Sequence, residues 1–160
     1  MDTSVLRTRE MRLTLPHFSE STALKLGLIV LRLAQSEALS VAVDIRTPDR
    51  LLFRAALPGT APLNDRWLDR KAATAFAFGM SSLRVRHVLR EKGESLALHG
   101  CGDAGYAAQG GAHPIRVRGV GIVGMVTVSG LAETEDHALA ELGLKTLLAE
   151  MKPDPVIRRK

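Results

Sequence analysis

Asp136 and His137 come closest, among the residues of this chain, to a recognisable binding site. They stand in the first turn of a helical pattern that opens near Thr134, where unpaired backbone N–H groups attract anions. The simpler interpretation is that Thr134 caps this helix while Glu135 and Asp136 complement its dipole. The residues alone favour the simpler interpretation, because acidic residues are common at helix starts.

The histidines do not form a recognisable metal motif, since no two have the i, i+4 spacing of a helical metal pair. The five are His17, His87, His99, His113 and His137. The single cysteine, Cys101, excludes an internal disulfide, a metal site made only of cysteines and a c-type haem attachment motif. The sequence therefore predicts no metal site and gives no positive support for thiol or hydrolase catalysis.

Residues Gly119–Gly124 spell a literal GxGxxG. In a dinucleotide-binding fold these glycines would lie between a strand and a helix. Here they run into Met125–Val128, which is a strand pattern, so the nucleotide interpretation is rejected. We expect Gly119 and Gly121 to form a tight hairpin and Gly124 to permit a close backbone approach within a sheet.

Arg70 and Lys71 lie about one turn after Asn64 and Asp65 in a second helical pattern. One interpretation is a solvated face on which Asp65 pairs with the basic residues, a weak interaction at a surface. The other is a cationic patch for a carboxylate, such as a haem propionate or a small organic acid. The residues by themselves favour the solvated face.

The composition is that of one globular domain with an aliphatic core. Of 160 residues, 46% are hydrophobic and only 4% aromatic. The net charge of +5 is dispersed, apart from a basic tail over residues 153–160, so we predict no nucleic-acid partner.

The apolar segment Ala23–Ala34 is interrupted by Lys25 and Arg32 and is too short to cross a membrane. As a helix it is apolar nearly all round, so we expect a second subunit to cover part of it. No secretory signal is visible, and one cysteine suits a reducing compartment. These features predict a cytoplasmic protein that forms a homo-oligomer and has no membrane partner.

Hydrophobic periodicity predicts hairpins alternating with helices. Residues 1–18 are a loosely specified lead-in, with a short strand or turn near residues 13–15. The expected elements are then a helix over 19–38, strands 41–45 and 51–57, and helices 64–78 and 81–92. A long loop over 94–111 is followed by strands 114–118 and 122–129 and by a helix from 134 that ends before Pro153. This order predicts an α+β fold in one domain, with an antiparallel sheet flanked by helices in a profilin-like or PAS-like layered architecture.

Three stretches together resemble a known family: Leu57–Trp67, Arg70–Ser82 and Gly110–His137. The chain is similar, over about Leu15–Met151, to the uncharacterised bacterial and fungal branch of the HbpS-like, haem-degrading-domain superfamily. The resemblance implies a helix-flanked antiparallel sheet, homo-oligomers, and in some relatives the binding or degradation of haem.

Three positions depart from the pattern of that branch. Ala72 and Ala73 stand where an Asn is usual, Met80 replaces a usual His, and His113 replaces a usual aromatic residue. If the Asn or the usual His supports a ligand, haem chemistry in this chain is put in doubt.

The resemblance also implies a binding site for haem or a related anionic ligand. It would comprise Trp67, Arg70, Lys71, Gly110, Gly111, His113, Ser129, Asp136 and His137. Cations would hold carboxylates, His137 or His113 could approach iron, and the two glycines would shape a loop over the ligand. The alternative is a non-enzymatic assembly or adaptor protein in which the same positions stabilise subunit contacts. Whether the chain is an enzyme stays open at this point.

Overall fold

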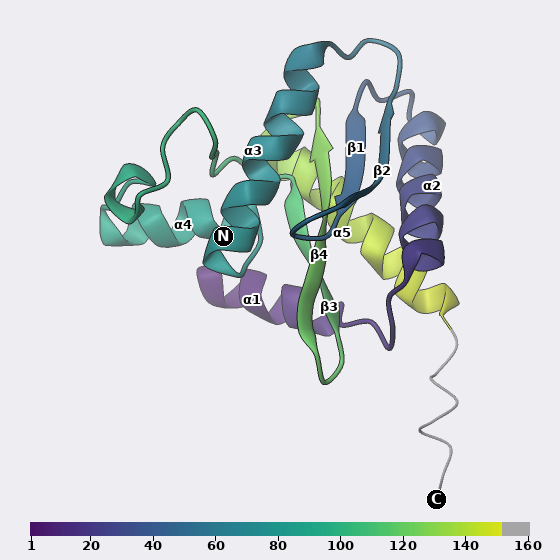
Figure 1. Ribbon diagram of the computed structural model, residues 1–160, viewed down its shortest axis with the longest axis horizontal. Helices are drawn as coiled ribbons and strands as arrows, with labels where there is room; N and C mark the ends of the chain where they lie inside the picture. Colours follow the sequence, from purple (N-terminus) through teal and green to yellow (C-terminus); the bar gives the residue numbers. More distant parts are fainter. Residues whose placement is uncertain (152–160) are drawn as a thin grey trace, which may run out of the picture.

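The computed structural model describes residues 1–151 and contains one four-stranded sheet surrounded by helices (Figure 1). The elements in chain order are α1 Thr3–Arg12, α2 Glu20–Ser36, β1 Ala42–Arg46, β2 Leu51–Ala56, α3 Pro62–Phe78, α4 Ser82–Lys92, the 3-10 turn η1 Ala97–His99, β3 Ala112–Val117, β4 Gly121–Ser129 and α5 Glu133–Glu150. The predicted α+β architecture is confirmed.

The sheet has the strand order β2-β1-β4-β3, and every neighbouring pair is antiparallel. Two hairpins, β1–β2 and β3–β4, are joined by the pairing of β1 with β4, so these two strands are central. Gly119 and Gly121 have positive φ values in the β3–β4 hairpin. A Cβ on Gly124 would lie 2.6 Å from the Arg46 carbonyl oxygen, which confirms the expected close approach.

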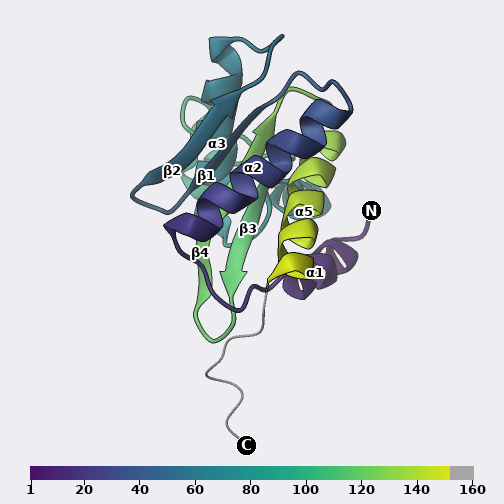
Figure 2. The ribbon, with the colours of Figure 1, turned by 90° about the vertical axis from the view of Figure 1, so that its right-hand side faces the viewer.

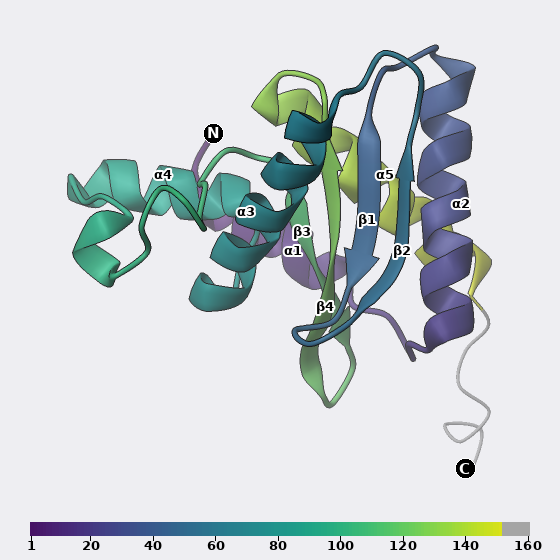
Figure 3. The same ribbon diagram turned by 45° about the horizontal axis from the view of Figure 1, so that its top comes forward.

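Helices cover both faces of the sheet. Helices α2 and α5 pack together on one face, and α3 packs on the other (Figures 2 and 3). The main core lies on the first side and draws aliphatic side chains such as Leu26, Val43, Val126 and Leu144 from both helices and the sheet. A smaller cluster that includes Ala75 lies beneath α3. Within residues 1–151, no helix is long and apolar enough to cross a membrane.

The helices begin and end in different ways. Ser19 caps α2, and Gly79 ends α3 in the left-handed conformation. Helix α3 begins earlier than expected, at Pro62, and the Asn64 side chain accepts from the Ala61 N–H at 2.9 Å. Helix α5 begins at Glu133 without a side-chain cap, so Thr134 is not the cap. Asp136 is free for another role.

The lead-in is not loosely specified: Thr3–Arg12 forms α1. Its periodicity is weak because few of its residues are apolar, and polar contacts hold it instead. The buried Glu10 carboxylate pairs with Arg84 at 2.9 Å and accepts from the Ser81 N–H at 3.2 Å. The expected strand near residues 13–15 reduces to one bridge between Leu15 and Val117.

Further details concern α2, β3 and the C-terminal end. Leu24 and Leu28 of α2 are about half exposed, so this helix is not covered all round within the monomer. A bulge between Ile115 and Arg116 interrupts the pairing of β3 with β4. The basic tail and Pro153 lie outside the described residues.

Leu144 and Leu142 test whether burial under α2 stabilises α5. Leu144 is fully buried and Leu142 is 46% exposed. We expect Leu144→Ala to lower the free energy of unfolding by about 2–5 kcal/mol, because it opens a cavity in the core. Leu142→Ala should change it by no more than about 0.5 kcal/mol. Urea denaturation measures both, and equal losses would contradict this packing.

Candidate functional site

A cleft of about 300 Å³ lies where β4 ends, between the first turns of α3 and α5. Its lining residues are Asn64, Trp67, Lys71, Gln109, Ser129, Gly130, Leu131, Glu133 and Asp136. Four of the nine predicted site residues, Trp67, Lys71, Ser129 and Asp136, therefore share one cleft. Its volume is at the lower end of the range that holds small organic ligands.

A buried ion pair lies at this cleft. Lys71 is 3% exposed, and its ammonium group donates to Asp136 Oδ2 at 2.8 Å and to the Val128 carbonyl oxygen at 3.1 Å. Asp136 Oδ1 accepts from the Leu131 N–H at 2.9 Å, and Oδ2 also accepts from the Gly130 N–H at 3.4 Å. Burial raises the pKa of Asp136, while Lys71 and these N–H groups oppose that shift. The carboxylate thus anchors the first turn of α5 to α3.

Gly111 makes this ion pair sterically possible. A Cβ on Gly111 would lie 2.8 Å from Lys71 Nζ, and the residue has a φ of +141° that disfavours other side chains. The Gly110 N–H donates to Glu133 at 3.4 Å. Gly111 therefore leaves room for the lysine, and Gly110 lies against the start of α5.

Asn64 fixes the opposite wall. Its carbonyl oxygen is held by the Ala61 N–H, so its amide nitrogen is directed to Ser129 Oγ at 3.3 Å. Ser129 is 3% exposed at the last residue of β4. The sequence analysis missed Asn64 as a site residue because it reads equally well as a helix cap, which it also is.

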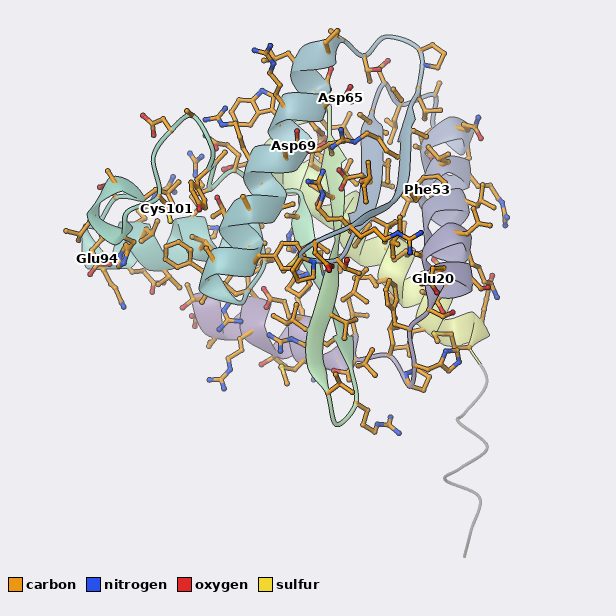
Figure 4. All side chains as sticks on the ribbon, viewed as in Figure 1. Glu20, Phe53, Asp65, Asp69, Glu94 and Cys101 are labelled. Carbon is orange, nitrogen blue, oxygen red and sulfur yellow. The ribbon has the colours of Figure 1, made fainter. Side chains whose placement is uncertain are left out.

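Arg70 does not line the cleft. Its guanidinium group lies over the Trp67 ring, 4.7 Å from the centroid, and it lines a separate hollow with Asp69 and Asp103. Asp69, rather than the expected Asp65, forms ion pairs on α3, with Arg46 and Arg54. Figure 4 labels Asp69 on α3, and its two arginine partners belong to β1 and β2.

His113 and His137 form a second cluster away from the cleft. His113 on β3 is fully buried and His137 on α5 is 4% exposed, with ring centroids 5.5 Å apart. His137 Nε2 lies 3.3 Å from Glu141 Oε2, and Arg9 of α1 pairs with the other oxygen of Glu141. Glu141 was not among the predicted site residues, because only pairs of histidines were considered as a helical metal motif. The i, i+4 spacing of His137 and Glu141 was the available signal.

The second cluster has strongly shifted acid–base properties. Burial and the neighbouring His137 lower the pKa of His113 to about 4, so its imidazole is neutral at physiological pH. Burial raises the pKa of Glu141, but His137 and Arg9 more than offset this and lower it to about 2. The cluster therefore combines a neutral imidazole with an ionised carboxylate.

The chain is a small α+β domain with a polar cleft where β4 ends, and comparison with known proteins identifies its family. Residues 18–145 match the family described as haem degrading protein HbpS-like. A UPF0303 protein of Streptomyces avermitilis is 45% identical over 144 residues, covering 89% of this chain and 88% of that protein. UPF0303 protein SCO2848 of Streptomyces coelicolor is 40% identical over 146 residues, covering 91% and 92%. The chain belongs to the HbpS-like family.

Solved structures show the same fold. Yeast Ybr137w superposes with a TM-score of 0.84 at 31% identity, covering 94% of this chain and 89% of that one. HbpS gives a TM-score of 0.69 at 20% identity, covering 82% and 90%. A complex of PduOC with haem gives 0.70 at 19% identity, covering 80% and 93%.

The residues at the cleft suit the propionate groups of a haem but include no ligand for its iron. Haem iron is held in proteins by His, Cys, Met or Tyr. The residues that line the cleft include none of these, and His113 and His137 are buried elsewhere. Neither histidine lines this cleft, so the approach of His113 or His137 to an iron stays a prediction that the cleft does not support. The lysine, amides and hydroxyl of the cleft do suit a carboxylate.

Removing Lys71 tests the ion pair. Lys71→Met leaves the Asp136 charge buried without its cation, and we expect a loss of about 3–5 kcal/mol in the free energy of unfolding. Lys71→Met/Asp136→Asn removes both charges and keeps an acceptor for the Leu131 N–H, so it should recover at least half of that loss.

Lys145→Met is the matched control, because Lys145 is an exposed lysine on α5. It should change stability by no more than about 0.5 kcal/mol. Urea denaturation of the wild type and the three variants measures these changes in the free energy of unfolding. A double variant no more stable than Lys71→Met would contradict a simple charge pair.

Proposed function

We propose that this protein binds a small ligand carrying a carboxylate or a similar anionic group in the cleft between α3 and α5. One observation carries the proposal. A lysine ammonium has three N–H bonds, and within residues 1–151 Lys71 uses two of them, for Asp136 and Val128. A ligand oxygen is the natural partner for the third.

The rest of the cleft supports an acceptor-rich ligand. The Asp136 oxygens already accept from Lys71, Gly130 and Leu131, so this carboxylate has little capacity left for a donor from the ligand. Gln109 adds an amide, Ser129 a hydroxyl and Trp67 an indole N–H and an apolar ring. These groups can hold an oxygen-rich head and pack against a flat apolar body.

Haem is the candidate that the family supplies. Its propionates carry the group that the cleft suits, so we propose that haem, if it binds here, is held through a propionate and not through His113 or His137. A compact organic acid fits the cleft volume of about 300 Å³ more completely. Both are therefore used as probes.

Haemin titration followed at the Soret band, with a thermal-shift series of small carboxylic acids, tests the proposal. The useful variant is Lys71→Met/Asp136→Asn, because it removes the donor while limiting the stability loss. We expect saturable binding to the wild type that weakens by about 10-fold or more in this variant, the value of one charge-assisted hydrogen bond. Lys145→Met should bind like the wild type.

Two results would contradict the proposal. If the double variant binds as tightly as the wild type, the ligand lies outside this cleft. If neither haemin nor any carboxylic acid binds the wild type, the alternative of a non-enzymatic assembly or adaptor protein is favoured.

We further propose that the chain self-associates. Leu24 and Leu28 on α2 are 53% and 48% exposed, and apolar surface of this kind is commonly covered by a second subunit. Light scattering of the purified protein should give a dimer or a larger oligomer. A monomer at micromolar concentration would contradict this part of the proposal.

A further inference from the structure

The buried cluster of His113, His137 and Glu141 has the composition of a metal site. Each residue offers one ligand atom, and these atoms lie within 4.8 Å of one another. The three residues come from β3 and from successive turns of α5, so the packing of the helix on the sheet brings them together.

Several polar atoms in this cluster have no hydrogen-bond partner among the described residues. They are His113 Nε2, both ring nitrogens of His137 and Glu141 Oε2, of which His137 Nε2 and Glu141 Oε2 face each other at 3.3 Å. His113 and His137 are both more than nine-tenths buried. Buried polar atoms in native proteins are nearly always paired, because leaving them unpaired is costly. One ion would supply a partner for an atom of each residue at once.

Neighbouring groups orient the ligand atoms. His113 Nδ1 lies 3.0 Å from the Pro114 carbonyl oxygen, which can only accept, so Nδ1 carries the proton and the Nε2 lone pair is free. Arg9 donates to Glu141 Oε1 through Nε at 3.0 Å, which leaves Oε2 on the side of His137. A backbone carbonyl behind one ligand and a guanidinium behind another are typical of the groups that orient metal ligands.

We propose that His113, His137 and Glu141 bind one divalent transition-metal ion of the Zn²⁺, Fe²⁺ or Co²⁺ class. Two imidazoles with one carboxylate suit these ions and not Ca²⁺ or Mg²⁺, which prefer oxygen ligands only. Because Arg9 of α1 contacts Glu141, an ion bound by the three residues would link α1 with β3 and α5. Its role is therefore structural, and it is independent of ligand binding in the cleft.

Cobalt is the direct probe, because Co²⁺ bound to nitrogen and oxygen ligands absorbs visible light. The full chain, treated with chelator and then freed of it, is titrated with CoCl₂, and Zn²⁺ is then added as a competitor. We expect one Co²⁺ per chain, displacement by one Zn²⁺, and a melting temperature that rises with Zn²⁺ concentration.

The variants His113→Asn and Glu141→Gln are close in size to the natural residues, and Gln can still accept from Arg9. Each should weaken Co²⁺ binding by about 100-fold or more, since even groups behind the ligands contribute about 10–100-fold. His99→Asn is the matched control, because His99 Nε2 lies 2.8 Å from Glu94 Oε2 in a partly exposed pair. It should bind Co²⁺ like the wild type.

Circular dichroism with chelator present shows whether each variant folds. A folded Glu141→Gln protein that has lost Co²⁺ binding supports the site even if His113→Asn fails to fold. The proposal is overturned if the folded wild type binds neither ion, if both cluster variants bind like the wild type, or if only His99→Asn loses binding.

Discussion

Lys71 extends from α3 to Asp136 in the first turn of α5, and the two side chains meet out of contact with bulk water. The helices concerned cover opposite faces of the sheet, so the ion pair ties both layers together where β4 ends. Each charge of this pair depends on the other, because removing either partner leaves an uncompensated charge in a poorly solvated place. The backbone N–H groups of Gly130 and Leu131 complete the coordination of the carboxylate.

This constraint explains several features nearby. Gly111 is needed because a side chain there would occupy the space of the Lys71 ammonium. The first turn of α5 has no side-chain cap, since Ala132 occupies the cap position, and Asp136 is directed to the preceding loop and to α3. The cleft forms beside the ion pair and takes its polarity from it. The proposed ligand binding and the docking of the two layers thus depend on the same lysine.

A second set of buried polar contacts, separate from the ion pair, involves α1. Arg9 contacts Glu141 and Glu10 contacts Arg84, so a helix with little apolar surface is attached mainly through charges. The histidines lie in the same region, between β3 and α5. The family relationship therefore does not by itself say where a metal or a haem would be held in this chain, because the histidines and the cleft occupy different places.

The sequence by itself determined the order of the elements and the antiparallel sheet. Alternation in Val41–Ile45, the apolar run Ile122–Ser129 and the glycine at position 79 are local signals, and they act over a few residues. The resemblance to a family also predicted Lys71, Ser129 and Asp136 as binding-site residues. Sequence analysis missed α1, because that helix is stabilised by contacts with residues far along the chain and not by its own periodicity.

Only the tertiary structure decided how the predicted site residues are divided. Lys71 and Asp136 are 65 positions apart and share one hydrogen bond, whereas His137, next to Asp136, points to a different cluster. On a helix, adjacent side chains are turned by about 100° from each other, so neighbours in sequence reach different sides. The joining of His113 to His137 and Glu141 likewise needed the packing of α5 on β3. No spacing within one segment could have shown it.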